Sequence, residues 1–472
     1  MRILFAASEA HPYASTGGLA GVAGSLPAAL AQSGHQVSLV MPFYGCIRGS
    51  DDPEWMSHRF TTFAGEQFGV ARSVHPLGGF PVYLVSRDEH FDRKGIYGPD
   101  PGSAYPDNAA RFAFFCRAVV ALCESLPEPP ELIHCHDWQT GLVPVYLRNS
   151  IRPAVVLTIH NLHYQGNFPR DDYGCTCLPW SLFTMQGLEF YGTFSFLKGG
   201  ILCADRITTV SRTYAREIQT PGYGEGLDGV LVQRSNALSG IVNGIDSLNW
   251  NPSSDPALAA SYSAGSISRR KECRRDLLRV TGQAGGGIVA GVVSRLTGQK
   301  GLDILFPVME VLVREGMGFV VLGTGESSYE KTLAGLQKKY PGKISAIIRY
   351  DDTMARKIFA GSDVLVMPSR FEPCGLAQMI GMRYGAVPLV RRTGGLADTV
   401  DDVDQGGCGF VFRKPDPDHL LKTFRRAVDL YNRRNRWAWL VKKCMERDNS
   451  WDSRVGAYEE VYREAMAERS GR

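Results

Sequence analysis

Short runs of β-branched and aliphatic residues alternate along the chain with longer stretches in which apolar residues recur every three or four positions. This alternation predicts strands separated by helices, and therefore parallel sheets that helices cover on both faces. One doubly wound sheet rarely holds so many strands, so the pattern predicts an α/β fold with two Rossmann-like, doubly wound parallel-sheet domains. The predicted strands are Ile3–Ala7, Val37–Met41, Val82–Val85, Leu132–Cys135, Val155–Ile159, Ile207–Val210 and Gly240–Val242 in the first half, and Ile288–Val293, Phe319–Leu322, Ile344–Ile348, Val364–Met367, Val387–Val390 and Gly409–Phe412 in the second.

A change in composition marks the boundary between the two predicted domains. The segment Asn243–Asp246 follows the last strand of the first half, and a stretch rich in Pro, Ser, Asp and Ala runs from 251 to 268 before the next sheet begins. We therefore predict an N-terminal domain over residues 1–245 and a C-terminal domain over residues 246–450.

Three amphipathic helical patterns follow the last predicted strand, over Pro417–Asn432, Arg436–Arg447 and Trp451–Arg469. We expect the last of them, within residues 451–472, to pack back across both domains and to rest on the N-terminal one.

The composition fits a soluble globular protein with large cores. Of 472 residues, 44% are apolar and 21% are charged, and 52 Lys and Arg against 48 Asp and Glu leave a net charge of +4. This near-neutral balance argues against a dedicated nucleic-acid-binding protein. No apolar run reaches the roughly 18–20 residues that span a bilayer, and the N-terminal apolar stretch, Ile3 to Ala7, is too short for a secretion signal. These features predict a cytoplasmic protein without a membrane partner.

Neither the cysteines nor the clustered cations indicate a special chemistry. Eleven cysteines, an odd number scattered along the chain, predict reduced thiols rather than a disulfide framework. The close pair Cys175-Thr-Cys177 lacks the second pair that a zinc site would need. We interpret the densest basic cluster as a solvated helix face; it comprises Arg269, Arg270, Lys271, Arg274 and Arg275.

One motif occurs once in each half of the chain. Thr16-Gly-Gly-Leu-Ala20 opens the first predicted helix, and Thr393-Gly-Gly-Leu-Ala397 occurs late in the second half. Each places two glycines before a helix N-terminus, where unpaired amides and the helix dipole favour an anion. Each pair alone could be a tight turn, but one pair per sheet, at the carboxyl ends of strands, favours a ligand held between the domains.

The strongest local cluster is the segment Pro368–Leu376, which follows a buried strand and carries Arg370 and Glu372, with Gly375 opening the next helix. A carboxylate beside a helix start can bind sugar hydroxyls while the helix amides bind a pyrophosphate. The alternative is a surface glutamate that caps a helix.

Two cations form the second candidate site. Arg295 and Lys300 lie between the first strand and the first helix of the second sheet. Two fixed cations at a strand end can neutralise a diphosphate leaving group without a metal. Either residue alone would be an ordinary surface cation.

Histidines end two strands of the first half. His134 and His136 share one face of a strand, Asp137 follows directly, and His160-Asn161 ends the next strand. A metal site must be considered, but the sequence offers no further clustered ligand. Polar residues that line the floor of a cleft are the favoured interpretation.

Three other motifs indicate no separate site. Asp402-Val-Asp404 and Asp416-Pro-Asp418 resemble the Asp-x-Asp of metal-dependent sugar transferases, but solvated turns explain them better. Gly323-Thr-Gly325 lacks the third glycine and the acidic residue of a dinucleotide fingerprint, which argues against a nicotinamide oxidoreductase.

Taken together, the segments resemble bacterial glycogen (starch) synthase of glycosyltransferase family 5, and the resemblance covers nearly the whole chain. It implies a GT-B fold with a cleft between two Rossmann-like domains. It also implies retaining transfer of glucose from ADP-glucose, a substrate, to the non-reducing end of an α-1,4-glucan such as glycogen, with no metal and no cofactor. The segments are Thr16–Leu19, Asp107–Phe112, His134–Trp138, Thr158–Gln165, Ala204–Leu231, Asn243–Asp246, Val293–Leu302, Pro368–Leu376 and Arg391–Val400.

The resemblance also implies roles for single residues. Glu372 matches the essential glutamate of the family, and Arg295 and Lys300 match its phosphate-binding pair. Asp137 and His160 match residues that line the glucose pocket. The donor-binding loops are matched by Cys374, Gly375, Leu376, Gly394 and Gly395, and the loop that closes over the diphosphate by Ser15, Gly17 and Gly18.

The chain also departs from the family pattern. Ser15 stands where the family usually has lysine, which removes a positive charge near the donor phosphates. Gly21, Gln139 and Ala377 replace a usual aspartate, histidine and threonine. Two alternatives therefore stand beside the synthase: an enzyme of the same fold that uses UDP-glucose or a maltodextrin, and a catalytically weakened protein that binds a nucleotide sugar or glucan.

Overall fold

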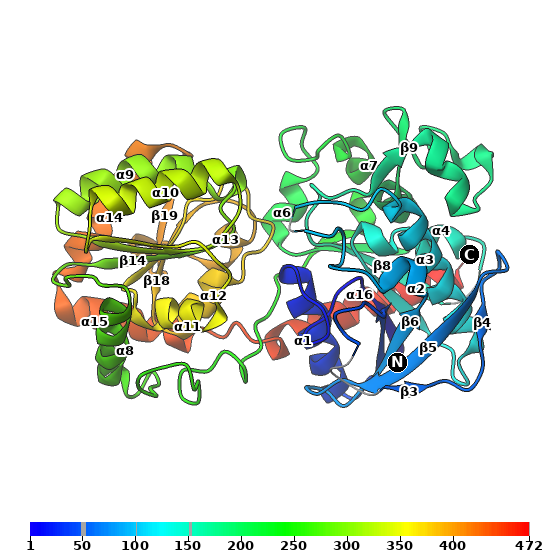
Figure 1. The fold of residues 1–472 in the computed structure, drawn as a ribbon, viewed down its shortest axis with the longest axis horizontal. Coiled ribbons are helices and arrows are strands. Elements are labelled where there is room, and N and C mark those ends of the chain that lie inside the picture. Colours follow the sequence, from blue (N-terminus) through cyan, green and yellow to red (C-terminus); the bar gives the residue numbers. More distant parts are fainter. Residues whose placement is uncertain (49–52, 101, 151–152, 472) are drawn as a thin grey trace. The chain divides into compact units, whose positions relative to one another are not determined.

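The computed structural model describes residues 1–48, 53–100, 102–150 and 153–471, and its internal contacts divide the chain into two compact units (Figure 1). Unit 1 comprises Met1–Gly244 and Trp451–Arg472, and unit 2 comprises Ile245–Ser450. The chain therefore leaves unit 1 near residue 244 and returns to it at residue 451.

Unit 1 is built on a large sheet with the strand order β13-β12-β8-β7-β1-β2-β6-β5-β3, in which β4 pairs with β5. The seven strands from β13 to β6 are parallel, and they are the strands that the hydrophobic pattern predicts for the first half. The last one lies two residues earlier than predicted. The bounds are β1 Arg2–Ala6, β2 Gln36–Pro42, β6 Pro81–Ser86, β7 Leu132–His136, β8 Ala154–Ile159, β12 Arg206–Thr209 and β13 Leu238–Gly240.

One edge of this sheet is antiparallel, and the hydrophobic pattern did not predict its strands. Strand β5 (Gln67–Val74) runs antiparallel to β6, and β3 (Glu54–Trp55) and β4 (Phe60–Thr61) pair antiparallel with β5. Only part of β5 is buried, so its sequence lacks the continuous apolar run of a central strand. A separate sheet of β9 (Asn167–Pro169), β10 (Glu189–Phe190) and β11 (Thr193–Ser195) also escapes the pattern because its strands are very short.

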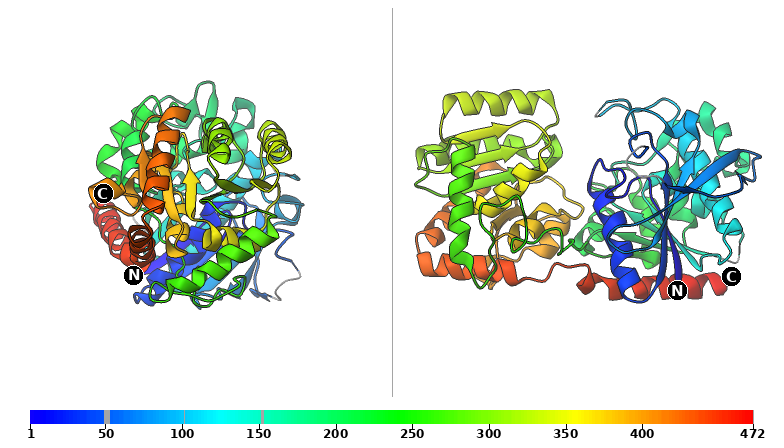
Figure 2. Two further views of the ribbon diagram at one scale, coloured as in Figure 1. Left: turned by 90° about the vertical axis from the view of Figure 1, so that its left-hand side faces the viewer. Right: turned by 60° about the horizontal axis from the view of Figure 1, so that its bottom comes forward.

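Helices cover both faces of the unit 1 sheet. Helices α1 and α16 pack together on one face, and α3, α4 and α5 lie on the other (Figure 2). The last helix thus belongs to unit 1, where its Arg469 donates to the carbonyl of Leu147 at 2.7 Å. The bounds are α1 Gly18–Gln32, α2 Asp88–Phe91, α3 Asn108–Ser125, α4 Val143–Tyr146, α5 Phe196–Cys203, α6 Arg212–Glu217, α7 Asp228–Gln233 and α16 Asp452–Ser470.

Unit 2 holds a parallel six-stranded sheet with the order β16-β15-β14-β17-β18-β19. Helices α9, α10 and α14 lie on one face, and α8, α11, α12 and α15 lie on the other (Figure 1). All six strands were predicted from the sequence. The bounds are β14 Val289–Val293, β15 Gly318–Leu322, β16 Ile344–Ile347, β17 Val364–Met367, β18 Val387–Arg391, β19 Phe410–Phe412, α8 Arg270–Val280, α9 Leu302–Arg314, α10 Ser327–Lys339, α11 Asp352–Gly361, α12 Ala377–Arg383, α13 Gly394–Thr399, α14 Pro417–Tyr431 and α15 Arg434–Glu446.

The basic cluster on α8 is only partly a solvated face, which corrects the interpretation from sequence. Arg270 is buried and its guanidinium donates to the carbonyl of Tyr384 at 2.9 Å. Arg274 forms an ion pair with buried Asp363 at 3.3 Å. These two cations fasten α8 to the unit, whereas the other three residues of the cluster are exposed.

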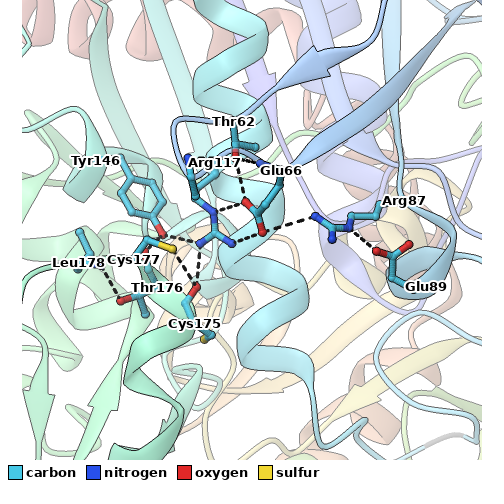
Figure 3. A network of polar contacts seen from close by, with 11 residues as sticks. Thr62, Glu66, Arg87, Glu89, Arg117, Tyr146, Cys175, Thr176, Cys177 and Leu178 are labelled. Atoms are coloured by element: carbon cyan, nitrogen blue, oxygen red, sulfur yellow. Dashed lines mark hydrogen bonds and ion pairs between the residues drawn. The ribbon is translucent and has the colours of Figure 1, made fainter.

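A buried arginine ties the antiparallel edge of unit 1 to helix α3. The guanidinium of Arg117 makes two hydrogen bonds to the carboxylate of Glu66, at 2.7 and 2.8 Å, and a third to the carbonyl of Cys175 at 2.8 Å (Figure 3). Burial alone would raise the pKa of Glu66, but the hydrogen bonds and the charge of Arg117 outweigh burial and hold this pKa below its usual value. The Cys175–Cys177 segment therefore serves as an anchor for this arginine.

We expect the substitution Arg117→Met to lower the free energy of unfolding by about 2–4 kcal/mol, because it leaves a partly buried carboxylate without its cation. The matched control is Arg87→Met. Arg87 reaches the same carboxylate only at 3.5 Å, and its side chain is more exposed than that of Arg117, so its loss is expected to cost less than about 1 kcal/mol. Urea unfolding of both variants measures the difference, and equal losses would contradict this assignment.

Candidate active site

In unit 2, the loop that follows β17 presents Glu372. Its side chain is buried, with 5% of the residue exposed, and Oε2 accepts from Lys300 Nζ at 2.7 Å and from Ser369 Oγ at 3.0 Å. Lys300 comes from the turn after β14. Gly301 follows it in the left-handed region at φ +66°, where a Cβ would collide with the carbonyl of Pro368. A glycine there lets the two loops approach closely enough for the ion pair.

Gln299 links the same two loops and was not identified from the sequence. Its amide side chain donates to the carbonyl of Phe371 at 3.3 Å, and its backbone carbonyl accepts from the amide of Arg370 at 2.8 Å. Its Oε1 also accepts from the guanidinium of Arg295 at 3.2 Å. Arg295 is exposed, so this contact orients a cation that remains accessible to a ligand.

The Gly323–Gly325 motif supports the loop that carries Arg295. A Cβ at Gly323 would collide with the carbonyl of Ser294, and one at Gly325 with the carbonyl of Leu296. The amide of Leu296 donates to the carbonyl of Thr324 at 2.9 Å. The glycines are therefore explained by close packing of two backbones, in agreement with the absence of a complete dinucleotide fingerprint.

The second glycine pair packs directly on the glutamate loop. Gly394 lies at φ +43°, where a Cβ would collide with the carbonyl of Glu372. The amide of Gly395 donates to that same carbonyl at 3.0 Å, and a Cβ there would overlap Cys374. In this structure the pair holds the glutamate loop in place.

Gln378, at the start of α12, fastens the remaining part of this loop. Its buried amide donates to the carbonyls of Cys374 at 3.1 Å and of Gly375 at 2.8 Å, and to Thr399 Oγ1 at 3.0 Å. Gly375 itself lies at φ +74°. Leu376, which follows, is only partly buried. Segments around Cys374 and Gly394 are thus joined into one cluster with Glu372.

In unit 1, Asp137 and His160 lie at the ends of the neighbouring strands β7 and β8. Oδ1 of Asp137 accepts from the backbone amide of His160 at 2.7 Å. Burial raises the pKa of this carboxyl to about 7, although the amides of His160 and Asn161 lower it. Asp137 lies at φ 56° and ψ −172°, a region that side-chain-bearing residues rarely adopt. Strain of this kind is concentrated at functional sites.

The rings of the three strand-end histidines, His134, His136 and His160, lie next to one another. His134 and His136 share one face of β7, with ring centroids 4.2 Å apart, as the spacing predicts. His134 bonds to Tyr462 of α16 at 2.9 Å and to Thr158 at 2.6 Å, and His136 Nδ1 lies 2.9 Å from His160 Nε2. Among the residues that the structure describes, no three His, Cys, Asp or Glu are grouped so that they could hold a metal ion.

Five partly or fully buried histidines make unit 1 sensitive to acid. Unfolded histidines titrate near pH 6.5, so below that pH the unfolded chain binds more protons than the folded one. The stability these groups contribute is complete above pH 6.5 and is lost as the pH falls toward their folded pKa values. Burial lowers the pKa of His134 and His160 to about 3 and that of His90 to about 4, and it also lowers those of His75 and His136.

Two buried carboxyl groups, Asp137 and Glu9, have raised pKa values and oppose this trend. The four histidines with strongly lowered pKa values, His90, His134, His136 and His160, outnumber the two carboxyls. We expect unit 1 to lose roughly 1.4 kcal/mol per pH unit for each histidine in excess between about pH 6.5 and 4.5. Hydrogen exchange followed by mass spectrometry, read separately for each unit, measures the effect. If the amides of unit 1 were equally protected at pH 6.5 and at pH 4.5, the expected loss of stability in acid would be contradicted.

The first glycine loop is anchored by Glu9, a residue that sequence reasoning passed over. Only 3% of Glu9 is exposed, and its carboxylate accepts from the hydroxyl and the amide of Thr16 and from Tyr97 OH at 3.1 Å. The sequence did contain a signal for this role, because Glu9 is a charged residue just beyond the buried strand β1. Ser15 and the two glycines that follow Thr16 are exposed.

The two copies of the Thr-Gly-Gly-Leu-Ala motif therefore differ in their physical basis. Gly17 has an extended backbone at φ −165°. Apart from the adjoining residues of the chain and the backbone of α1 itself, no atom of the described residues lies within 4 Å of a Cβ placed at Gly17 or Gly18. The fold does not require glycine there, whereas it does at Gly394. Space kept clear at an exposed helix start is typical of a loop that a ligand approaches.

The Asp-x-Asp motifs have structural roles, and the solvated turn expected from the sequence is wrong for Asp402, whose side chain is only 14% exposed. Asp402 accepts from the amide of Asp404 at 3.0 Å and pairs with Arg426 at 2.6 Å. Asp416 caps α14 by accepting from the amide of His419 at 2.9 Å.

The sequence of this chain is similar to those of known sugar-transferring enzymes. Residues 2–233 match the family described as the starch synthase catalytic domain, and residues 274–442 match the glycosyl transferases of group 1. Glycogen synthase 2 of Geobacter sulfurreducens is 44% identical over 485 aligned positions, and glycogen synthase of Geotalea uraniireducens is 44% identical over 492; each alignment covers 100% of both chains.

A solved structure is also similar. The catalytic domain of starch synthase IV from Arabidopsis thaliana, bound to ADP and acarbose, matches with a TM-score of 0.90 and 31% identity over 99% of both chains. Within the described residues, no helix is both long and apolar enough to span a membrane. Fold and sequence together define a glycosyltransferase with the GT-B fold. The chain belongs to the glycogen and starch synthase family. The predicted GT-B fold and the predicted family are therefore both confirmed.

Proposed function

We propose that this protein is a glycogen synthase that transfers glucose from ADP-glucose to the non-reducing end of an α-1,4-glucan, with retention at the anomeric carbon. The observation that carries the proposal is the buried ion pair of Lys300 with Glu372, next to the exposed cation of Arg295. The relatives named glycogen synthase, and the starch synthase solved with ADP and acarbose, support the choice of donor and acceptor.

The two cations would act on the leaving group. An ammonium group has three donors, so Lys300 can keep its 2.7 Å bond to Glu372 and still donate to a phosphate oxygen. Together with Arg295 it would stabilise the negative charge that develops on departing ADP. Fixed cations that act on developing charge supply several kcal/mol of transition-state stabilisation. We propose that these residues act without a metal or other cofactor.

Other residues would bind the sugar and the rest of the donor. Glu372, Asp137 and His160 would orient the glucosyl ring through hydrogen bonds to its hydroxyls. The acceptor hydroxyl would attack from the face that the phosphate leaves, and the phosphate would take its proton. The loops around Cys374–Leu376 and Gly394–Gly395 would position the donor, and the exposed loop of Gly17 and Gly18 would approach the diphosphate.

Product analysis tests the proposal. Purified protein is incubated with maltohexaose and either ADP-glucose or UDP-glucose, and the products are separated by chain length and examined by proton NMR. We expect stepwise extension by α-1,4-linked glucose with ADP-glucose. A preference for UDP-glucose would reassign the donor, and binding of ADP-glucose without extension would indicate a catalytically weakened binding protein.

Ser15 offers a prediction about donor affinity. The residue is exposed in the first glycine loop, where the family usually has lysine. We expect Ser15→Lys to lower KM for the donor about three- to thirtyfold, the gain from one charge-assisted phosphate contact, without changing the thermal midpoint. Ser15→Gln is the uncharged control. Equal KM values for the two variants would show that the missing charge does not limit donor binding.

A further inference from the structure

The histidine pair at the ends of β7 and β8 contains a feature that the proposed roles leave unexplained. His136 is fully buried, and its Nδ1 lies 2.9 Å from Nε2 of His160, with the rings stacked at 5.2 Å between centroids. The other nitrogen of His136, Nε2, is sealed from solvent and has no hydrogen-bond partner among the described residues. Its ring also stacks on that of Phe5, at 5.5 Å.

Both rings are neutral at physiological pH. Burial lowers the pKa of His160 to about 3 and that of His136 well below its ordinary value. A neutral imidazole carries one N–H and one bare nitrogen. The 2.9 Å hydrogen bond can therefore be made in two ways, and they place the protons on different nitrogens.

The orphaned nitrogen of His136 distinguishes these two arrangements. If His160 donated from Nε2, His136 would carry its own proton on Nε2, and a buried N–H would face no acceptor. If His136 donates from Nδ1, its Nε2 is a bare acceptor instead. Buried N–H groups without a partner are rarer in proteins than acceptors without one, because losing the donor's hydrogen bond to water is costly.

We infer that His136 is a positioning residue that donates from Nδ1 to His160 and thereby fixes the proton of His160 on Nδ1. His160 Nδ1 makes no hydrogen bond within the described part of the chain, and it is not one of the buried nitrogens that lack a partner there. It is therefore available to a ligand. His160 then meets the substrate as a hydrogen-bond donor, suited to a sugar hydroxyl oxygen. This inference rests on the proposed function insofar as it assigns a glucosyl group to His160.

The tautomer can be measured directly. Long-range nitrogen–proton correlation spectra of protein labelled with ¹⁵N-histidine separate protonated from bare ring nitrogens for its ten histidines, and a His160→Gln variant assigns the signal. We expect the proton of His160 on Nδ1 in the ligand-free protein. A proton on Nε2 overturns the inference. The spectrum does not depend on turnover, so it decides the tautomer even if the proposed function fails.

Two variants of His136 test the consequence for the reaction. His136→Leu retains most of the volume but cannot donate, whereas the side-chain amide of His136→Asn can replace the Nδ1–H. We expect the leucine variant to lose about ten- to a hundredfold in kcat, the usual effect of removing an outer partner of a functional imidazole, with a much smaller change in donor KM. The asparagine variant should recover most of that loss.

Thermal midpoints separate positioning from packing. If kcat falls equally in both variants, or follows their midpoints rather than the presence of a donor, His136 is only a packing residue and the inference is wrong.

Discussion

The substitution Lys300→Met is expected to lower kcat/KM for the nucleotide sugar about a hundred- to a thousandfold, as does loss of one fixed donor at a developing charge in other enzymes. Methionine keeps the length of the stem but cannot neutralise a phosphate. It also leaves Glu372 as a buried carboxylate without the cation that lies 2.7 Å away. Because the substitution can affect both catalysis and stability, steady-state kinetics and the thermal midpoint are measured on the same variant.

Two further variants separate charge neutralisation from stability. Lys300→Met combined with Glu372→Gln removes the buried unpaired charge, so it should regain stability without regaining activity. Lys357→Met is the matched control, because Lys357 also forms an ion pair in unit 2, with Asp276 on α8. It should retain near-normal kinetics. Wild-type kinetics in the Lys300 variant, or an equal loss in the Lys357 variant, would contradict the assignment.

The two copies of the glycine motif provide the second large effect. Gly394→Ala is expected to destabilise unit 2 by about 3 kcal/mol or more, because its Cβ at φ +43° would collide with the carbonyl of Glu372. Displacing that loop by about 1 Å would cost on the order of a hundredfold in kcat.

The equivalent change in unit 1 serves as its control. At Gly17 the backbone is extended, and a Cβ would meet no atom of the described residues within 4 Å apart from its chain neighbours, so Gly17→Ala should leave stability within about 0.5 kcal/mol. If a ligand approaches this loop closely, the same change should raise donor KM about tenfold. Urea unfolding and donor titration of both variants test the pair, and an equal loss of stability would contradict the distinction.

Most of the fold could be predicted from the sequence because central strands of parallel sheets are buried on both faces. Val364–Met367 is an example in which prediction and structure agree at both ends. The antiparallel strand Gln67–Val74 was missed because its exposed positions break the apolar run. Short strands such as Glu189–Phe190 are fixed by their partners rather than by their own pattern.

The candidate site was predictable where a residue type had a chemical reason at a strand end. Glu372, Lys300 and Arg295 were selected in this way, and the structure places all three on adjoining loops of unit 2. The supporting residues were not predictable. Gln299 and Gln378 act through hydrogen bonds to the backbone of segments distant in sequence, which neither spacing nor composition reveals.

The two copies of the glycine motif have the same sequence but different structural roles, which the sequence alone could not distinguish. Both predicted an anion-binding helix start. In the structure one copy is required by backbone packing against Glu372, and the other is left open in an exposed loop anchored by Glu9. The difference depends on which backbone lies nearby, and only the folded chain establishes that.

Glycogen-dependent release of ADP from ADP-glucose tests the central claim most directly. Wild-type protein and Glu372→Gln, which keeps the side-chain shape, are compared with and without glycogen, after thermal unfolding has shown that both are folded. We predict release by the wild type only when glycogen is present, and its loss in the variant. Equal release by the folded variant, or release that does not depend on glycogen, would contradict the account.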